Sequence, residues 1–526
     1  MNQNYAYAYN DENGTLNSMT VSSGNVNDTL NYSYDAFQRL ISQTTVRTGL
    51  TLAKEYSYKN LSGNRTTTQV SGYTAKVNGT TVDSYSYTYD NLGNITTINH
   101  NGYAPLSYTY DAQNQLIKVV EGDFRYEYAY DTYGNILSVK TYEEATDELM
   151  SSNTYSYTNT QWVDQLMAFN GQSITYDEIG NPLSYYNGSR YTFTWNGREL
   201  ATAVKGSTSV SYKYGADGLR TQKTVGSTVY NYYYVDGLLV RQTWGTNYMD
   251  FLYDESGSPY SFIYNGTQYY YIKNLQGDVM RIVDATGAVV ANYTYDAWGK
   301  VTNSGNIIGL YNPIRYRGYY YDTDTGFYYL QSRYYDPTIK RFINADSVNY
   351  LGANGDFASL NLYTYCSNNP IMYSDESGCA PKWLETALSV GMYVFNGSLG
   401  LVSSGILNNL TNAIYYNYIS DGESDLTSSS YNTSPGYKHI NRWDRLDYVK
   451  SQENTPAKYN STAGKYFAEY NLHMYAWFFT GWALDTNIPF IKDAAISAEN
   501  ADIIAGEKDE DWYVNLATAI LKILGL

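Results

Sequence analysis

The sequence predicts a mainly β repeat protein, an array of antiparallel hairpins, followed by a small and mainly α-helical domain. One observation is a repeat centred on Tyr-Asp, in which Asp90, Asp111 and Asp131 are separated by 21 and 20 residues. Another is the composition, since 65 Tyr and 42 Gly suit many strands joined by tight turns. A third is the loss of the repeat near residue 379, where helical patterns begin. A fixed period indicates that one supersecondary unit stacks on the next.

Each repeat is predicted to be one hairpin. The clearest copies are YTYDNLGNI (87–95), YTYDAQNQL (108–116), YAYDTYGNI (128–136) and ITYDEIGNP (174–182). In the first copy, Tyr87 and Tyr89 point to one face of a strand and Thr88 to the other. Asp90 then offers its carboxylate to the backbone of the turn, and Gly93 permits a positive φ. We therefore expect antiparallel hairpins throughout residues 1–378, with strands ending near Asp35, Asp90, Asp111, Asp131 and Asp177.

The excess of tyrosine predicts the character of the sheet. The chain holds 65 Tyr but only 14 Phe and 9 Trp, whereas a dry sandwich core favours Val, Ile, Leu and Phe. A tyrosine packs its ring while its hydroxyl stays wet or hydrogen-bonded. We therefore expect a thin β wall with a polar interior, in which cross-strand tyrosines join neighbouring hairpins.

Charge and cysteine content exclude some classes of protein. A net charge of −17 and a pI near 4.6 disfavour a general nucleic-acid-binding surface or an anionic-membrane surface. Cys366 and Cys379 are the only cysteines, so disulfides are not the main support, and one bridge or two free thiols remain alternatives. The first residues already belong to a repeat and lack the basic and apolar regions of a signal peptide.

Two stretches near residue 378 resemble a known family. They are YRGYYYDTDTGFYYLQSRYYDPTIKRFINAD (316–346) and SLNLYTYCSNNPIMYSDESG (359–378). Together with the repeats they are similar to the Rhs/YD-repeat family, which includes bacterial Rhs and wall-associated toxins, insecticidal toxin-complex C subunits and animal teneurins. The resemblance covers roughly residues 1–378.

The resemblance implies three parts. Residues 1–315 would form a YD-repeat hairpin spiral, a hollow and here partial β-shell, and the closing segment (316–378) would plug it. Residues 379–526 would be a variable effector domain, held and delivered by the shell in competition between bacteria. Family members normally carry long N-terminal export regions, so we expect this chain to be a fragment of a secreted or cell-surface protein. The alternative is a displaced toxin-bearing cassette, which the family also shows. A cognate immunity protein is the partner that such a role implies.

The region after residue 378 is predicted to be mainly α-helical. Twelve of the 65 tyrosines fall there, and helical patterns cover residues 383–395, 441–452, 461–485 and 511–524. No charged side chain occurs from Thr386 to Ser420, but Asn and Ser residues interrupt the apolar run. A buried helical hairpin is therefore favoured over a membrane-active segment, and no stable membrane span is expected.

Two aspartates are candidates for self-cleavage near residues 378/379. Bacterial family members cut themselves after the shell with a pair of aspartates from two Asp-Pro-x-Gly motifs, and by position Asp346 and Asp375 match them. Two carboxylates brought together share a proton, so that one acts as base and one as acid. This sequence departs from the motif, since Ser347 and Glu376 replace the prolines and Cys379 replaces the usual leucine. The alternative is that both residues are turn aspartates.

Residues 322–326 match a calcium-binding loop only in part. DTDTG (322–326) resembles the start of a calcium loop, but its glycine comes one residue early and Arg333 stands where a bidentate glutamate belongs. A tight turn is the favoured interpretation. We predict no metal site and no cofactor.

The C-terminal region offers a candidate effector site. Glu469 and His473 lie one helical turn apart on one face of the predicted 461–485 helix, an arrangement that suits an acid–base pair. His439 and Arg442 lie on a neighbouring stretch, and a His/Glu/Arg set is able to cleave a phosphodiester without metal. The alternative is an amphipathic helix with one histidine satisfied in the core. A nuclease-like activity is thus an expectation only.

A second function class stays open. Tyrosine-rich sheets also suit a non-enzymatic cell-surface adhesin that binds glycans or partner proteins, because aromatic faces stack on sugars. The abrupt change of composition just after the closing segment favours the toxin interpretation.

Overall fold

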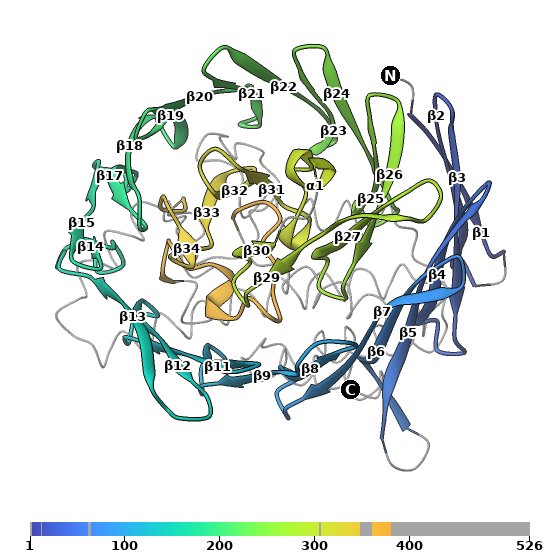
Figure 1. Cartoon of the computed structure of the whole chain (residues 1–526), viewed down its shortest axis with the longest axis horizontal. Helices are drawn as coiled ribbons and strands as arrows, with labels where there is room; N and C mark the ends of the chain where they lie inside the picture. Colours follow the sequence, from blue (N-terminus) through green and yellow to red (C-terminus); the bar gives the residue numbers. More distant parts are fainter. Residues whose placement is uncertain (1–2, 12, 62–64, 304–306, 348–359, 380–526) are drawn as a thin grey trace, which may run out of the picture. The chain divides into compact units, whose positions relative to one another are not determined.

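The computed structural model describes residues 3–11, 13–61, 65–303, 307–347 and 360–379 (Figure 1). The chain divides into two compact units, Met1–Gly422 and Glu423–Leu526, and every described residue belongs to the first. Within the described residues nearly all regular structure is antiparallel β, as the sequence predicts. The same part of the chain contains no helix that is long and apolar enough to span a bilayer.

The described strands pair almost entirely in chain order. Fifteen form a first sheet: β1 (Gln3–Tyr9), β2 (Leu16–Ser23), β3 (Val26–Tyr34), β4 (Leu40–Arg47), β5 (Leu50–Leu61), β6 (Arg65–Val77), β7 (Thr80–Tyr89), β8 (Ile95–His100), β9 (Leu106–Tyr110), β10 (Leu116–Glu121), β11 (Phe124–Tyr130), β12 (Ile136–Glu143), β13 (Leu149–Ser156), β14 (Ala168–Phe169) and β15 (Gln172–Ser173). Thirteen form a second: β16 (Thr175–Tyr176), β17 (Pro182–Tyr186), β18 (Arg190–Asn196), β19 (Glu199–Lys205), β20 (Thr208–Tyr214), β21 (Arg220–Val225), β22 (Thr228–Val235), β23 (Leu238–Trp244), β24 (Asn247–Tyr253), β25 (Pro259–Tyr264), β26 (Thr267–Lys273), β27 (Val279–Asp284) and β28 (Val289–Asn292). We call β1–β28 the wall.

The remaining elements follow the wall. They are β29 (Thr294–Tyr295), β30 (Val301–Asn303), α1 (Ile307–Tyr311), the 3-10 turn η1 (Tyr316–Gly318), β31 (Tyr320–Asp322), β32 (Phe327–Leu330), β33 (Arg333–Asp336), β34 (Arg341–Phe342) and the 3-10 turn η4 (Cys366–Asn368). Strands β31–β34 make a small meander of their own. In Figure 1 the wall strands run around these elements.

The Tyr-Asp turn closes as the sequence predicts. Asp90 Oδ1 accepts the backbone N–H groups of Leu92 and Asn94, each at 2.9 Å, and Asp90 Oδ2 accepts the Asn94 side-chain amide at 3.0 Å. Gly93 has φ +90° and donates its N–H to the Asp90 carbonyl. The carboxylate therefore replaces three hydrogen bonds that the turn backbone and Asn94 would otherwise make to water.

The same turn recurs along the wall. Asp111, Asp131 and Asp177 each accept two backbone N–H groups at 2.8–3.0 Å and the side-chain amide four residues on. The preceding strands end at Tyr34, Tyr89, Tyr110, Tyr130 and Tyr176, so the predicted strand ends are confirmed.

The tyrosine before each aspartate links one hairpin to the previous one. The hydroxyls of Tyr89, Tyr110 and Tyr130 donate to the carbonyls of Val70, Ile95 and Leu116 at 2.6, 2.7 and 2.6 Å. Phenylalanine fills the same space but has no donor, which explains why the repeat uses tyrosine. The predicted cross-strand tyrosine pairs include Tyr56 with Tyr73, Tyr73 with Tyr85, and Tyr185 with Tyr191. The tyrosine before the turn instead lies opposite an aliphatic residue such as Ile95 or Leu116.

One part of the wall is two sheets thick, unlike the thin wall that composition predicts. The first strands contact β24–β27, about one circuit later in the chain: Tyr73 Oη donates to the Lys273 carbonyl at 2.8 Å. Asp28 accepts hydrogen bonds from Tyr260, Gln268 and Tyr270 at 2.7–3.1 Å. In Figure 1 the β1–β7 strands lie beside β24–β27. The spiral thus overlaps itself, and buried polar groups tie the layers together.

Candidate functional site

The closing segment contacts successive turns of the wall through asparagine amides. Asn369 Nδ2 donates to Asn94 Oδ1 at 3.1 Å, and Asn368 Nδ2 donates to Gln115 Oε1 at 2.8 Å. Asn361 Nδ2 donates to Asn135 Oδ1 at 2.8 Å in the next repeat. The amides of the wall turns thus bind the aspartate of their own repeat and a closing-segment residue at once. The closing segment is held by the repeat itself.

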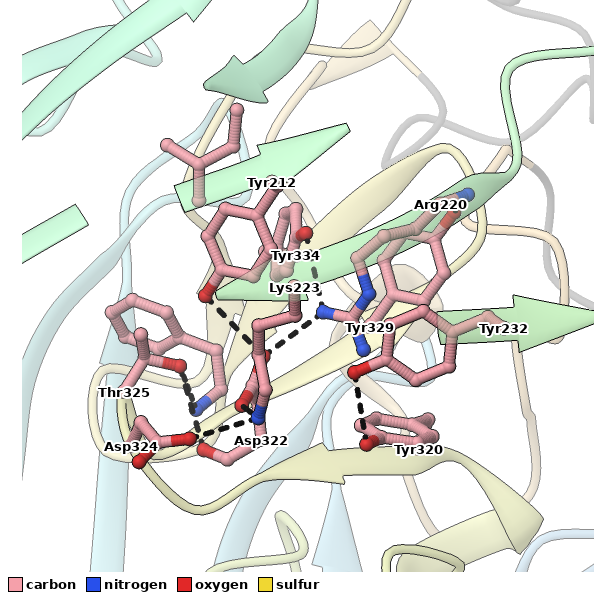
Figure 2. Close-up of polar contacts among 12 residues, drawn as sticks. Tyr212, Arg220, Lys223, Tyr232, Tyr320, Asp322, Asp324, Thr325, Tyr329 and Tyr334 are labelled. Carbon is pink, nitrogen blue, oxygen red and sulfur yellow. Dashed lines mark hydrogen bonds and ion pairs between the residues drawn. The ribbon is translucent and has the colours of Figure 1, made fainter. Parts of the chain in front are cut away.

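A buried ion-pair network anchors β31 to strand β21 of the wall (Figure 2). Arg220 Nη1 lies 2.9 Å from Asp322 Oδ2, and both residues are fully buried. Lys223 Nζ lies 2.6 Å from Asp322 Oδ1 and 2.8 Å from Asp324 Oδ2. Burial alone raises the pKa of the Asp322 carboxyl, but Lys223 and Arg220 more than offset this and hold the pKa below its ordinary value. The carboxylate is therefore charged inside the protein.

Aromatic rings complete the surroundings of Arg220. Its guanidinium carbon lies 4.5 Å from the ring centre of Tyr329 and 4.7 Å from those of Tyr232 and Tyr320 (Figure 2). Among the described residues, Arg220 Nε and Nη2 have no hydrogen-bond partner, so ring faces take the place of acceptors there. This network positions β31 and the strands that follow it.

The 322–326 segment is a tight turn, as favoured. The backbone N–H groups of Thr325 and Gly326 donate to the Asp322 carbonyl. The Asp322 carboxylate forms ion pairs with Lys223 and Arg220. Across the described residues, no group of three or more His, Cys, Asp or Glu side chains is arranged to hold a metal ion.

Asp346 and Asp375 meet at one arginine. Arg333 Nη2 lies 2.9 Å from Asp346 Oδ2 and 3.4 Å from Asp375 Oδ2, and all three residues are buried. Arg333 begins β33, whereas the aspartates come from the two stretches that follow β34 and η4. Two residues 29 positions apart are thus brought onto a single guanidinium nitrogen.

The peptide between Gly378 and Cys379 is held by the same groups. Asp375 Oδ1 accepts the N–H of Gly378 at 2.8 Å and that of Cys379 at 3.1 Å, while Arg333 Nε donates to the Gly378 carbonyl. Gly378 has φ +73°, and a Cβ there would lie 2.5 Å from the Leu330 carbonyl oxygen and 2.7 Å from Ser332 Oγ. Only glycine allows this close approach, which presses the peptide onto the β32–β33 turn.

Burial makes both carboxyls weaker acids than an exposed aspartate. Burial raises the pKa of Asp375 to about 7, Arg333 opposes the shift, and the charge of Asp346 adds to it. Burial also raises the pKa of Asp346, again against Arg333. A carboxyl with a pKa near 7 exchanges a proton at neutral pH, which is what general acid–base chemistry needs.

Sequence reasoning noted Arg333 only as a misfit to a calcium loop, and its role at this site was missed. The available signal was a lone cation in the aromatic stretch FYYLQSRYYD (327–336), because a buried arginine needs carboxylate partners. The effector candidates His439, Arg442, Glu469 and His473 lie outside the described residues, as does the predicted helical domain at 380–526. Cys366 and Cys379 are both free thiols.

The fold and the packed closing segment together define a YD-repeat shell. A family model described as Teneurin YD-shell matches residues 65–371, more than half of the chain. The chain therefore belongs to the YD-shell family, and the Rhs/YD-repeat resemblance is confirmed.

Curated relatives include bacterial toxins. The tRNA nuclease WapA of Bacillus subtilis (strain 168) is 33% identical over 303 residues, which cover 55% of this chain and 12% of that protein. The toxin subunit YenC2 of Yersinia entomophaga is 33% identical over 138 residues, 26% of this chain and 13% of that protein. The chain thus spans about an eighth of the length of these relatives.

A solved structure has the same fold. The complex of TcdB2, TccC3 and Cdc42 matches with a TM-score of 0.58 and 19% identity, over 75% of this chain and 21% of that one. At this identity the match establishes the architecture alone.

Proposed function

We propose that this protein is a toxin-delivery shell that carries a C-terminal effector region and frees it by cutting its own chain between Gly378 and Cys379. One observation carries the proposal. Arg333 donates a hydrogen bond to the carbonyl of that peptide bond and Asp375 accepts one from its N–H, at the point where the closing segment ends. The toxin relatives support the delivery role. A secreted or cell-surface location and an immunity partner belong to the same proposal.

The groups at the bond have distinct roles. Arg333 Nε, on the Gly378 carbonyl, would stabilise the negative charge that develops on this oxygen during attack. Asp375, beside the Cys379 nitrogen, would deliver a proton to the leaving amine. Asp346 shares Arg333 with Asp375 and would act as the base toward the attacking group. Asp375 would thus be the general acid and Asp346 the general base.

The effector would act after release. We propose residues 379–526 as this effector, with Glu469 and His473 as an acid–base pair and His439 and Arg442 as groups that bind a phosphodiester. The name of the WapA relatives, tRNA nuclease, supports a nuclease-like activity.

Expression of residues 379–526 in bacterial cells tests the effector role. Growth arrest with the wild-type region, relieved by His473→Ala at equal protein level, is the expected result. Normal growth with the wild-type region accumulating in soluble form would contradict it. Arrest that persists with His473→Ala would retain the effector and reject the proposed site.

A further inference from the structure

The residue after the proposed cut is a cysteine, and its thiol lies within the group of residues that hold the bond. Cys379 Sγ lies 3.1 Å from Ser332 Oγ and 3.9 Å from the Ser377 carbonyl oxygen. Cys379 is half-buried, and its thiol is free. A cysteine thiol has an intramolecular route to the carbonyl carbon of the residue before it, through a five-membered ring. Attack therefore requires no second molecule.

Three features of the site match the needs of such an attack. The Gly378 carbonyl already accepts a hydrogen bond from Arg333 Nε, which polarises it. The Cys379 amide already contacts Asp375 Oδ1 at 3.1 Å, next to the nitrogen that must leave. Gly378 carries no side chain on the crowded side facing Leu330 and Ser332, so the peptide is held close to β33 in one position. No other peptide bond among the described residues is seen in contact with both Arg333 and Asp375.

We propose that Cys379 is the nucleophile of the cleavage, and that the chain passes through a thioester between Gly378 and the Cys379 side chain. Sγ bonds to the Gly378 carbonyl carbon and passes its proton to Asp346, the carbon–nitrogen bond breaks, and Asp375 gives its proton to the freed amine of Cys379. Water then adds to the thioester carbon and gives a proton to Asp375, the carbon–sulfur bond breaks, and sulfur recovers the proton that Asp346 holds. The products are the Gly378 carboxylate and a chain that begins with Cys379.

The thiol needs a base, and we assign this role to Asp346, which shares Arg333 with Asp375 at this peptide bond. Burial raises the pKa of the Cys379 thiol, and the negative charge of Asp346 adds to the shift. The thiol is therefore protonated at neutral pH and must pass its proton to a carboxylate as it attacks. The charged groups that act on this thiol are Asp346, Arg333 and Asp375, the same three that hold the bond.

This inference rests on the proposed self-cleavage. Hydroxylamine distinguishes cleavage through a thioester from cleavage by direct attack of water. Hydroxylamine captures a thioester as a hydroxamic acid, whereas direct attack by water on the amide yields a free carboxylic acid. The full-length chain is synthesised in a cell-free system with and without neutral hydroxylamine, so that the reagent is present before the cut, and the products are identified by intact mass. The expected product with hydroxylamine is residues 1–378 ending in a hydroxamic acid, together with a fragment starting at Cys379.

Variants of both cysteines complete the test. Cys379→Ala should slow cleavage on the order of 100-fold or more and abolish hydroxamate formation, because the nucleophile is gone. Cys379→Ser keeps an oxygen nucleophile and should yield a slower, still hydroxylamine-sensitive cleavage. Cys366→Ala removes the other thiol and should leave capture unchanged. Circular dichroism of each variant checks that the β fold is retained.

The outcomes distinguish the two proposals. Cleavage of folded Cys379→Ala at the wild-type rate, with a free acid at Gly378 in hydroxylamine, would overturn the thioester and leave self-cleavage standing. A cut at any other bond would also overturn the thioester route. A full-length wild-type chain that stays intact with and without hydroxylamine would overturn both.

Discussion

Arg220 and Asp322 form an ion pair, 2.9 Å from Nη1 to Oδ2, that is fully buried between the wall and the closing segment. Aromatic rings and Lys223 surround it, so its charges are neutralised inside the protein rather than by water. Breaking such a pair leaves an uncompensated charge in a medium that solvates it poorly. The loss of unfolding free energy when this pair is broken therefore measures how much it contributes to holding the closing segment on the wall.

Replacement of Asp322 by Asn should destabilise the shell by about 3–5 kcal/mol, because Arg220 loses its buried carboxylate. The midpoint of urea unfolding, followed by intrinsic fluorescence, measures this change. Asp147→Asn is the control: Asp147 pairs with Arg125 at the surface, with 74% of its side chain exposed, and should cost no more than about 1 kcal/mol. Equal effects of the two changes would contradict the anchoring role.

The tyrosine of the repeat should matter through its hydroxyl. Tyr130→Phe removes the hydrogen bond to the Leu116 carbonyl and should cost about 1 kcal/mol in unfolding free energy. Tyr155 is the matched control, because its buried hydroxyl has no partner among the described residues. Tyr155→Phe should therefore be neutral or stabilising. A larger loss for Tyr155→Phe than for Tyr130→Phe in urea unfolding would reject this account of the repeat.

The turn aspartate should matter more than an ordinary surface aspartate. Asp131→Ala removes three acceptor contacts, and Asn135, which also binds Asn361 of the closing segment, loses one of its two hydrogen-bond acceptors and keeps the Val163 carbonyl. We expect a loss of roughly 2 kcal/mol or more in unfolding free energy. Asp123→Ala, at an exposed turn position, should stay within about 0.5 kcal/mol of wild type. Parity between the two variants would contradict the proposed turn chemistry.

Asp375 should give stability a specific pH dependence. Its pKa is raised to about 7 in the folded protein, above the ordinary value of 3.8, so folding favours the protonated form. Its contribution to stability is full below pH 3.8 and is lost as pH rises through 7. Asp375→Asn removes this dependence. The melting temperature of the variant minus that of the wild type should therefore rise between pH 5 and pH 8, and a difference that is flat or falls would contradict the raised pKa.

Local chemistry made the repeats predictable. The strand before Asp90, the Asp90 turn and the return strand at Ile95 are all encoded within nine residues, so each hairpin followed from its own sequence. The overlap of β1–β7 with β24–β27 did not follow. It joins residues such as Tyr73 and Lys273 that lie 200 positions apart, and it depends on the curvature summed over the whole wall.

The candidate site was predictable in part. Asp346 and Asp375 were found because the resemblance assigns a role to their positions. Arg333 was missed because its two carboxylate partners lie 13 and 42 positions away in sequence, and no local pattern links them. The Arg220–Asp322 pair was hidden for the same reason, since its members belong to different parts of the fold.

Intact mass of the purified full-length chain tests the central claim most directly, namely that the closing segment ends in a site that cuts the chain. The account predicts two polypeptides, residues 1–378 and 379–526, for the wild type, and a single 59.5 kDa chain for Asp375→Asn. A folded wild-type protein that remains a single 526-residue chain after prolonged incubation at neutral pH would contradict it.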